Sequence, residues 1–174
     1  MARPTVNPTG HELMWPDTSI IVSKTDTKGI ITYANPTFQQ LAGYTDQELV
    51  GQPHNMIRHP WMPQCAFKLV WDTIQTGHEV FAYVVNMSRN GDHYWVFAHV
   101  TPTFGPDGTI TGYHSSRRVP KREAVELMTG LYASLCEEEA KHASPKDGME
   151  ASTKMLLDIL ASKETTYDKF ILSL

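Results

Sequence analysis

Five segments of the first 118 residues are rich in hydrophobic, β-branched and aromatic residues, and each segment has the length of a strand. An Asp-Thr-Lys-Gly turn separates the first two segments. The Asn90-Gly91 pair between the third and the fourth is a strong hairpin signal, because these residues tolerate the positive φ that tight hairpin turns need. The predicted strands cover residues 19–25, 30–34, 79–88, 93–104 and 109–118.

Helical spacing and capping signals occupy the interval between the second and third strands. Asn35 can cap a short helix that Gly43 ends. Thr45 and Glu48 form a capping box for one further turn. A longer helix with one apolar face is predicted at residues 62–75.

This order of elements predicts an α+β fold, in which a five-stranded antiparallel sheet carries helices over one face. After residue 120 the apolar residues recur at helical spacing, which predicts three C-terminal helices. Their apolar positions could form a bundle between two chains or fold back on the sheet. We therefore divide the chain into an N-terminal cap (1–17), a central domain (18–120) and a C-terminal helical segment (121–174). Within the cap, we expect Leu13, Met14 and Trp15 to pack on the central domain.

Composition excludes several classes of partner. The 174 residues carry a formal net charge of −4 and no run of Lys or Arg, which argues against nucleic acid and against a membrane surface. The apolar runs are far shorter than the roughly 20 residues of a spanning helix, and no secretory signal is visible. Cys65 and Cys136 lie in helix-like sequence and are expected to be free thiols. These features predict a cytoplasmic protein.

Residues 51–63 form the most unusual segment, because two histidines, an arginine and an asparagine lie there within six residues. Such groups are costly to bury unless each has a partner. Arg58 is a planar, permanent cation that suits a diphosphate or carboxylate, and His59 could stack on a ring or order the loop. Asn86 lies in an otherwise apolar strand, where its amide also needs partners. This segment and Asn86 indicate a site for a polar planar or anionic ligand.

Four motifs stand out in the central domain: Tyr33-Ala34-Asn35, Gly43-Tyr44-Thr45, the run Gly51-Gln52-Pro53-His54-Asn55-Met56 with Arg58-His59-Pro60, and Asn90-Gly91-Asp92-His93-Tyr94-Trp95-Val96. Together they resemble the PAS domain of Aer-type aerotaxis receptors over about residues 18–120. The resemblance implies a PAS fold that holds FAD non-covalently and reads redox state or oxygen in the cytoplasm. It also implies a signal to chemotaxis or a related pathway, delivered to a downstream signalling domain or a chemotaxis partner.

The same resemblance places FAD contacts at the positions of Asn35, Arg58, His59 and Asn86. The family often has an aspartate after its Arg-His-Pro motif, where this chain has Trp61. It often has a tryptophan leading into the third strand, where this chain has Val80. The indole of Trp61 could supply the aromatic surface that Val80 lacks.

Strand alternation assigns further residues once the pocket is placed as in the family. Ala98 would face the pocket, whereas His99 would lie on the outer face. Arg117 would face inward at the end of the last strand, in contact with the ligand or in a salt bridge. Phe67 and Trp71 share a helix face that is either core or pocket wall. The predicted cofactor-binding residues are Asn35, Arg58, His59, Trp61, Phe67, Trp71, Asn86 and Arg117.

Other functions compete with the flavin sensor. A b-type haem needs only one axial histidine, so His59 could serve a gas-sensing PAS domain. A ligand-free PAS module could act only in dimerisation, and we expect a homodimer through the N-terminal cap or the C-terminal helices. No Ser/His/Asp order, P-loop or metal-binding pair of Cys or His stands out, so we expect neither an enzyme nor a metal site.

Overall fold

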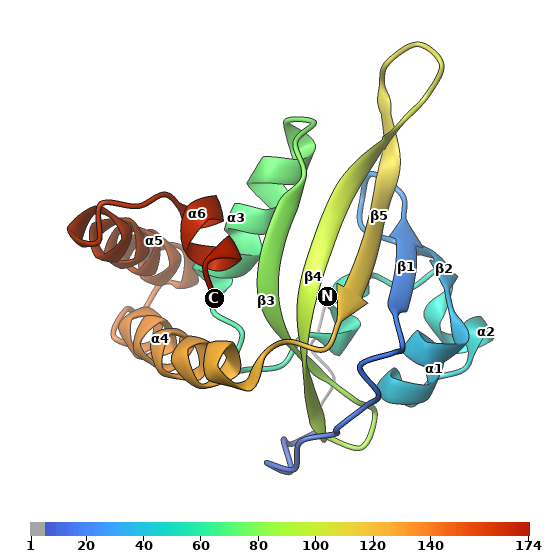
Figure 1. The fold of residues 1–174 in the computed structure, drawn as a ribbon, viewed down its shortest axis with the longest axis horizontal. Helices are drawn as coiled ribbons and strands as arrows, with labels where there is room; N and C mark the ends of the chain where they lie inside the picture. The colour runs from blue at the N-terminus through green and yellow to red at the C-terminus, as the bar shows by residue number, and fades with distance from the viewer. Residues whose placement is uncertain (1–5) are drawn as a thin grey trace.

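A computed structural model describes residues 6–174, and its centre is a five-stranded antiparallel sheet of spatial order β2-β1-β5-β4-β3 (Figure 1). The first and last strands of the sequence pair with each other and thereby join the first hairpin to the last three strands. This arrangement confirms the predicted α+β class. The strands are β1 (Ile21–Thr25), β2 (Ile31–Ala34), β3 (Val80–Met87), β4 (His93–Phe104) and β5 (Ile110–Arg118).

Four short helical elements follow β2 and lead to β3. The predicted caps are confirmed: the Asn35 side chain accepts the Phe38 N–H at the start of α1, and Gly43 ends α1 with a φ of +74°. The longer helix begins at Gln64, two residues later than predicted, because Pro63 disfavours a helical conformation for the residue before it. These elements are α1 (Pro36–Ala42), α2 (Asp46–Leu49), the 3₁₀ turn η1 (His54–Ile57) and α3 (Gln64–Gln75).

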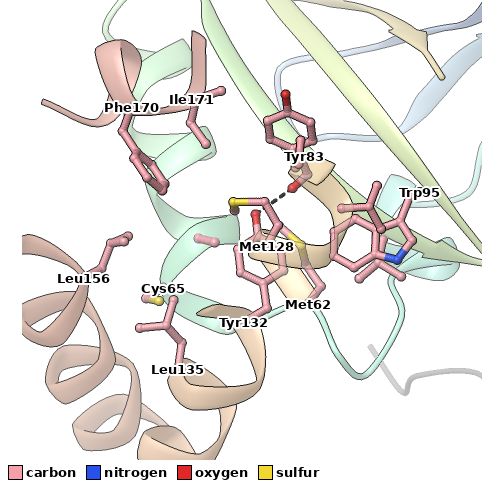
Figure 2. Close-up of a cluster of buried hydrophobic side chains, with 14 of the residues drawn as sticks. Met62, Cys65, Tyr83, Trp95, Met128, Tyr132, Leu135, Leu156, Phe170 and Ile171 are labelled. Carbon is pink, nitrogen blue, oxygen red and sulfur yellow. Dashed lines mark hydrogen bonds between the residues drawn. The ribbon is translucent and has the colours of Figure 1, made fainter. Parts of the chain in front are cut away.

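The C-terminal segment folds back on its own chain as α4 (Arg122–Ala140), α5 (Pro145–Ser162) and α6 (Tyr167–Leu172), beside β3 and α3 (Figure 1). Figure 2 shows the cluster that these helices form with the outer face of β3 and β4. Tyr132 of α4 stacks on Trp95 of β4 with ring centres 5.9 Å apart. The C-terminal helices thus fold back on the sheet of their own chain, which is one of the two arrangements that the sequence allowed. The apolar positions offered for a bundle are largely buried within one chain, among them Met128, Leu135 and Leu156.

At both edges of the sheet, backbone groups form hydrogen bonds with residues outside the sheet. At the β3 edge, the Tyr132 hydroxyl donates a hydrogen bond of 2.6 Å to the Tyr83 carbonyl (Figure 2). At the β2 edge, the Ile31 N–H donates to Gln52 and the Ile31 carbonyl accepts from Gly51, each at 2.8 Å. The outermost strands therefore have partners beyond the sheet.

The N-terminal segment lies along the start of β4. The Leu13 N–H donates to the His93 carbonyl at 2.7 Å, and the Trp15 indole donates to the Trp95 carbonyl at 3.4 Å. Leu13 and Trp15 pack on the domain as predicted, but the prediction for Met14 is wrong, because its side chain is 69% exposed. The first five residues of the predicted cap lie outside the described residues.

Gly148 and Gly130 provide a matched test of how closely α4 and α5 approach. A Cβ at Gly148 would lie 2.6 Å from the Glu139 carbonyl oxygen, whereas a Cβ at Gly130 would meet nothing within 4 Å. We expect Gly130→Ala to raise the free energy of unfolding by up to about 1 kcal/mol through helix propensity. Gly148→Ala should lower it by about 1–3 kcal/mol through overpacking. Denaturant titration measures both values, and equal stabilisation by the two substitutions would contradict the close contact.

Candidate functional site

A cavity of about 110 Å³ lies between α3 and the inner face of the sheet. Helix α3 and the loop before it supply most of its apolar wall, and β1, β3 and β5 supply most of its polar side chains. Its wall contains no aspartate or glutamate. The lining residues are Ser23, Thr25, His54, Arg58, Met62, Phe67, Val70, Trp71, Ile74, Val84, Asn86, Ala98, Val100, Tyr113, Ser115 and Arg117.

Arg117 faces inward from β5, as strand alternation predicted, and is 2% exposed. Its Nη2 donates to the Ser23 hydroxyl, and its Cζ lies 4.7 Å from the ring centre of Phe38. Burial lowers the pKa of Arg117 to about 10, so the guanidinium still carries its charge at neutral pH. The alternative prediction of a salt bridge is wrong, since no carboxylate pairs with Arg117 among residues 6–174.

His54 completes a short chain of contacts with Arg117 through Ser23. The Ser23 hydroxyl lies 3.1 Å from His54 Nε2. Because this oxygen accepts from Arg117, its single proton is best used toward His54 Nε2. Burial first, and then the charge of Arg117, lower the pKa of His54 to about 3, so the imidazole is neutral. The sequence marked His54 only as one of the polar groups of residues 51–63 and gave no signal for Ser23.

Asn86 and Arg58 meet where β3 approaches the loop before α3. Asn86 is 3% exposed, its Nδ2 has no hydrogen-bond partner among the described residues, and its backbone forms a bridge with that of Arg58. Arg58 Nη2 donates to the Met62 carbonyl at 2.8 Å, and the guanidinium lies 5.0 Å from the Phe67 ring centre. Glu48 pairs with Arg89 at 2.7 Å.

Aromatic side chains from α3 and β5 form a further part of the cavity wall. Trp71 meets Tyr113 edge to face with ring centres 5.5 Å apart, and Phe67 meets Trp71 at 6.4 Å. Phe67 and Trp71 therefore belong to the cavity wall, which was one of the two predictions for this helix face. Ala98 lines the cavity, as expected. His99 lies outside it, stacked on Phe81 at 4.2 Å.

Asn35 is not part of the cavity wall. Its Oδ1 accepts from the N–H groups of Phe38 and Val22, each at 3.0 Å, and its Nδ2 donates to the Ile20 carbonyl at 2.8 Å. The side chain thus ties α1 to β1. Its contact with FAD stays a prediction.

His59 and Trp61 also lie outside the cavity wall, in an aromatic cluster with His93. Ring centres are 4.5 Å apart for His59 and Trp61, 4.9 Å for Trp61 and His93, and 5.5 Å for the two histidines. His59 is fully buried, and burial, followed by His93, lowers its pKa to about 4. Trp61 is 44% exposed. The ligand contacts of both residues stay predictions.

Comparison with known proteins agrees with this architecture. The PAS fold family matches residues 31–117, half of the chain, and the chain belongs to this family. It is 45% identical over 119 residues to the aerotaxis receptor of Escherichia coli (strain K12), which confirms the resemblance predicted from the sequence. That match covers 68% of this chain and 23% of the receptor.

The chain is also similar to more distant proteins, in sequence or in fold. The nitrogen fixation regulatory protein of Klebsiella pneumoniae is 29% identical over 100 residues, 58% of this chain and 20% of that protein. The chain therefore spans about a fifth to a quarter of these two relatives. The light-state structure of the blue-light photoreceptor Aureochrome1 LOV aligns with a TM-score of 0.58 at 19% identity, over 63% of this chain and 88% of that one. Within residues 6–174, no helix is long and apolar enough to cross a membrane.

The lowered pKa values of His54 and His59 predict acid sensitivity. Both imidazoles take up a proton in the unfolded chain near pH 6.5, but in the folded protein only near pH 3 and pH 4. Their contribution to stability is therefore complete above pH 6.5 and declines as the pH falls toward those values. Between pH 6 and 4.5 each group should add up to about 1.4 kcal/mol per pH unit to the slope of the unfolding free energy.

Denaturant titrations between pH 4.5 and 7 measure this slope. We expect His54→Gln to lower the overall stability. It should also make the unfolding free energy depend less steeply on pH, by removing the share of the slope that His54 contributes, which is up to half of the joint share of His54 and His59. His78→Gln, which alters an exposed side chain, is the matched control. An unchanged slope in His54→Gln would show that His54 is not held neutral by its surroundings.

Proposed function

We propose that this chain is a cytoplasmic PAS sensor that binds FAD non-covalently and converts redox state or oxygen level into a conformational signal for aerotaxis or a related pathway. One observation carries the proposal: the cavity combines an aromatic wall with buried N–H donors of Asn86 and Arg117 that lack a hydrogen-bond partner among residues 6–174. A flavin ring has flat apolar faces and an edge rich in hydrogen-bond acceptors, so it matches both features. Similarity to the aerotaxis receptor supports the same proposal.

The residues of the cavity divide into two roles toward such a ligand. Phe67, Trp71 and Tyr113 offer aromatic surfaces against a ring. Asn86 offers both an N–H donor and a carbonyl acceptor for a ring edge, while Arg58 and Arg117 offer charged donors.

The size of the cavity requires α3 to yield when a ring enters. Its volume of about 110 Å³ lies below the roughly 300 Å³ at which small-molecule pockets begin. The opposite wall is the sheet, whose strands are fixed by their ladder of hydrogen bonds. Phe67, Val70 and Trp71 stand on α3 alone, so we expect these side chains and their helix to move outward.

The C-terminal helices are placed to detect that movement. The Cys65 N–H at the start of α3 donates to Glu139 Oε1 of α4, and the Ser152 hydroxyl of α5 donates to the same oxygen, both at 3.0 Å. The Glu139 carboxylate therefore joins three helices at one point. We infer that α4 to α6 carry the signal away from the cavity.

A bound flavin supplies the redox chemistry, and on reduction its N5 atom changes from a hydrogen-bond acceptor to a donor. The Asn86 amide can follow this change by turning from its N–H to its carbonyl. Because the backbone of Asn86 bridges that of Arg58, a shift at Asn86 reaches the loop that leads into α3. From α3 the change passes to Glu139.

The visible absorption spectrum of the purified protein, before and after dithionite, tests the proposal first. We expect the two absorption bands of an oxidised flavin, which disappear on reduction, with FAD released on denaturation. A Soret band would instead identify haem. A protein without visible absorbance, even after incubation with FAD, would leave a module that acts only through dimerisation.

Glu139→Gln should uncouple the C-terminal helices from the cavity, because a neutral amide is a weaker acceptor for two donors. Hydrogen exchange of α4 in the oxidised and reduced FAD-loaded protein is the measurement. We expect the redox-dependent difference in protection to shrink at least several-fold in Glu139→Gln and to persist in Glu137→Gln, whose side chain is exposed on the same helix.

The same experiment examines Asn86. Asn86→Ala should bind FAD more weakly and, when loaded, show no redox-dependent difference in α4. A loaded Asn86→Ala protein that responds as the unaltered protein does would exclude Asn86 from the signal. A full response in Glu139→Gln would exclude the carboxylate as the junction.

A further inference from the structure

The charge around Arg117 is unbalanced. No carboxylate lines the cavity, and its one histidine is held neutral. Arg58 lies at the side where the loop before α3 enters, while Arg117 lies deep against β1. A buried cation without an anion is costly, because its loss of water is not repaid by a partner.

Arg117, which is 2% exposed, carries this cost. Its Nη2 donates a hydrogen bond to the Ser23 hydroxyl, and its guanidinium lies over the face of the Phe38 ring. Its Nε and Nη1 are buried and have no hydrogen-bond partner among residues 6–174. Ser23 and Phe38 are neutral, so they orient the cation without balancing its charge.

We propose that Arg117 makes the cavity select the negatively charged form of its ligand. This inference rests on the proposed function, since it takes the ligand to be a flavin. The ring of an oxidised flavin is neutral, and the addition of two electrons and one proton leaves it with one negative charge. The guanidinium is 2% exposed, so water screens its attraction for that charge only weakly.

Tighter binding of the reduced ring has a thermodynamic consequence. A cofactor that binds more tightly when reduced has a more positive midpoint potential in the protein than in solution, by about 30 mV for each tenfold difference in affinity of a two-electron couple. Arg117 is thus a residue that determines the potential at which the sensor responds. The Ser23 hydroxyl, which also contacts His54, holds the guanidinium in the same place whether the cofactor is oxidised or reduced.

The test is a potentiometric titration of the FAD-loaded protein with dithionite as electron donor, together with the dissociation constants of the oxidised and reduced forms. We expect Arg117→Gln to weaken the reduced form at least tenfold more than the oxidised form and to lower the midpoint potential by about 30 mV or more. Arg117→Lys should keep most of the positive shift in midpoint potential, because lysine keeps the positive charge. Arg118→Gln, an exposed neighbour on the same strand, should leave the potential unchanged.

A loaded Arg117→Gln protein with the potential of the unaltered protein would overturn the inference while leaving the proposed function intact. Failure of the unaltered protein to bind any flavin would overturn the proposed function itself. The premise has an independent check without cofactor: Arg117→Met should raise the melting temperature of the cofactor-free protein, because it removes an unbalanced buried charge. A fall in that temperature would show that the protein already balances the guanidinium.

Discussion

Helix α3 is packed on both sides, and the rest of the molecule depends on this constraint. One side of the helix, with Phe67 and Trp71, faces the cavity, and the other, with Cys65 and Ala66, belongs to the core shared with α4, α5 and α6. Met62, just before the helix, belongs to both. Close-packed interiors do not compress. A change of shape in the cavity must therefore be matched by a change among the C-terminal helices.

The sheet could be predicted almost residue by residue, because its strands are runs rich in β-branched and aromatic residues that are bounded by Gly, Asn and Asp turn residues. In β4, Ala98 and His99 take opposite faces, as the pattern indicates. The docking of the C-terminal helices could not be predicted in the same way. An apolar stripe shows that a helix must be covered, but not by which surface. Met14 illustrates the same difficulty on a smaller scale, since one apolar residue in a proline-rich segment has no periodicity to orient it.

Asn86 was visible in the sequence because it interrupts an apolar strand, and Arg117 because strand alternation turns it toward the cavity. Ser23 was not visible, because a serine in a strand is ordinary until an arginine from another strand is known to contact it. Asn35 shows the opposite limit. Its capping chemistry was evident from the sequence, and that local chemistry occupies its side chain in the fold. In the loop after η1, the placement of His59 and Trp61 depends on His93, which is distant in the sequence.

The contacts at the two outermost strands have a meaning beyond the sensor site. An open strand edge offers unpaired backbone groups to any other chain and can start fibrous association. Here the Tyr132 hydroxyl occupies a carbonyl of β3, and residues 51–52 occupy the backbone of Ile31 in β2. At these points the two ends of the sheet are blocked against strand addition from outside. Displacement of α4 would free the Tyr83 carbonyl, so the helix that we propose to carry the signal also protects part of the β3 edge from pairing with a foreign strand.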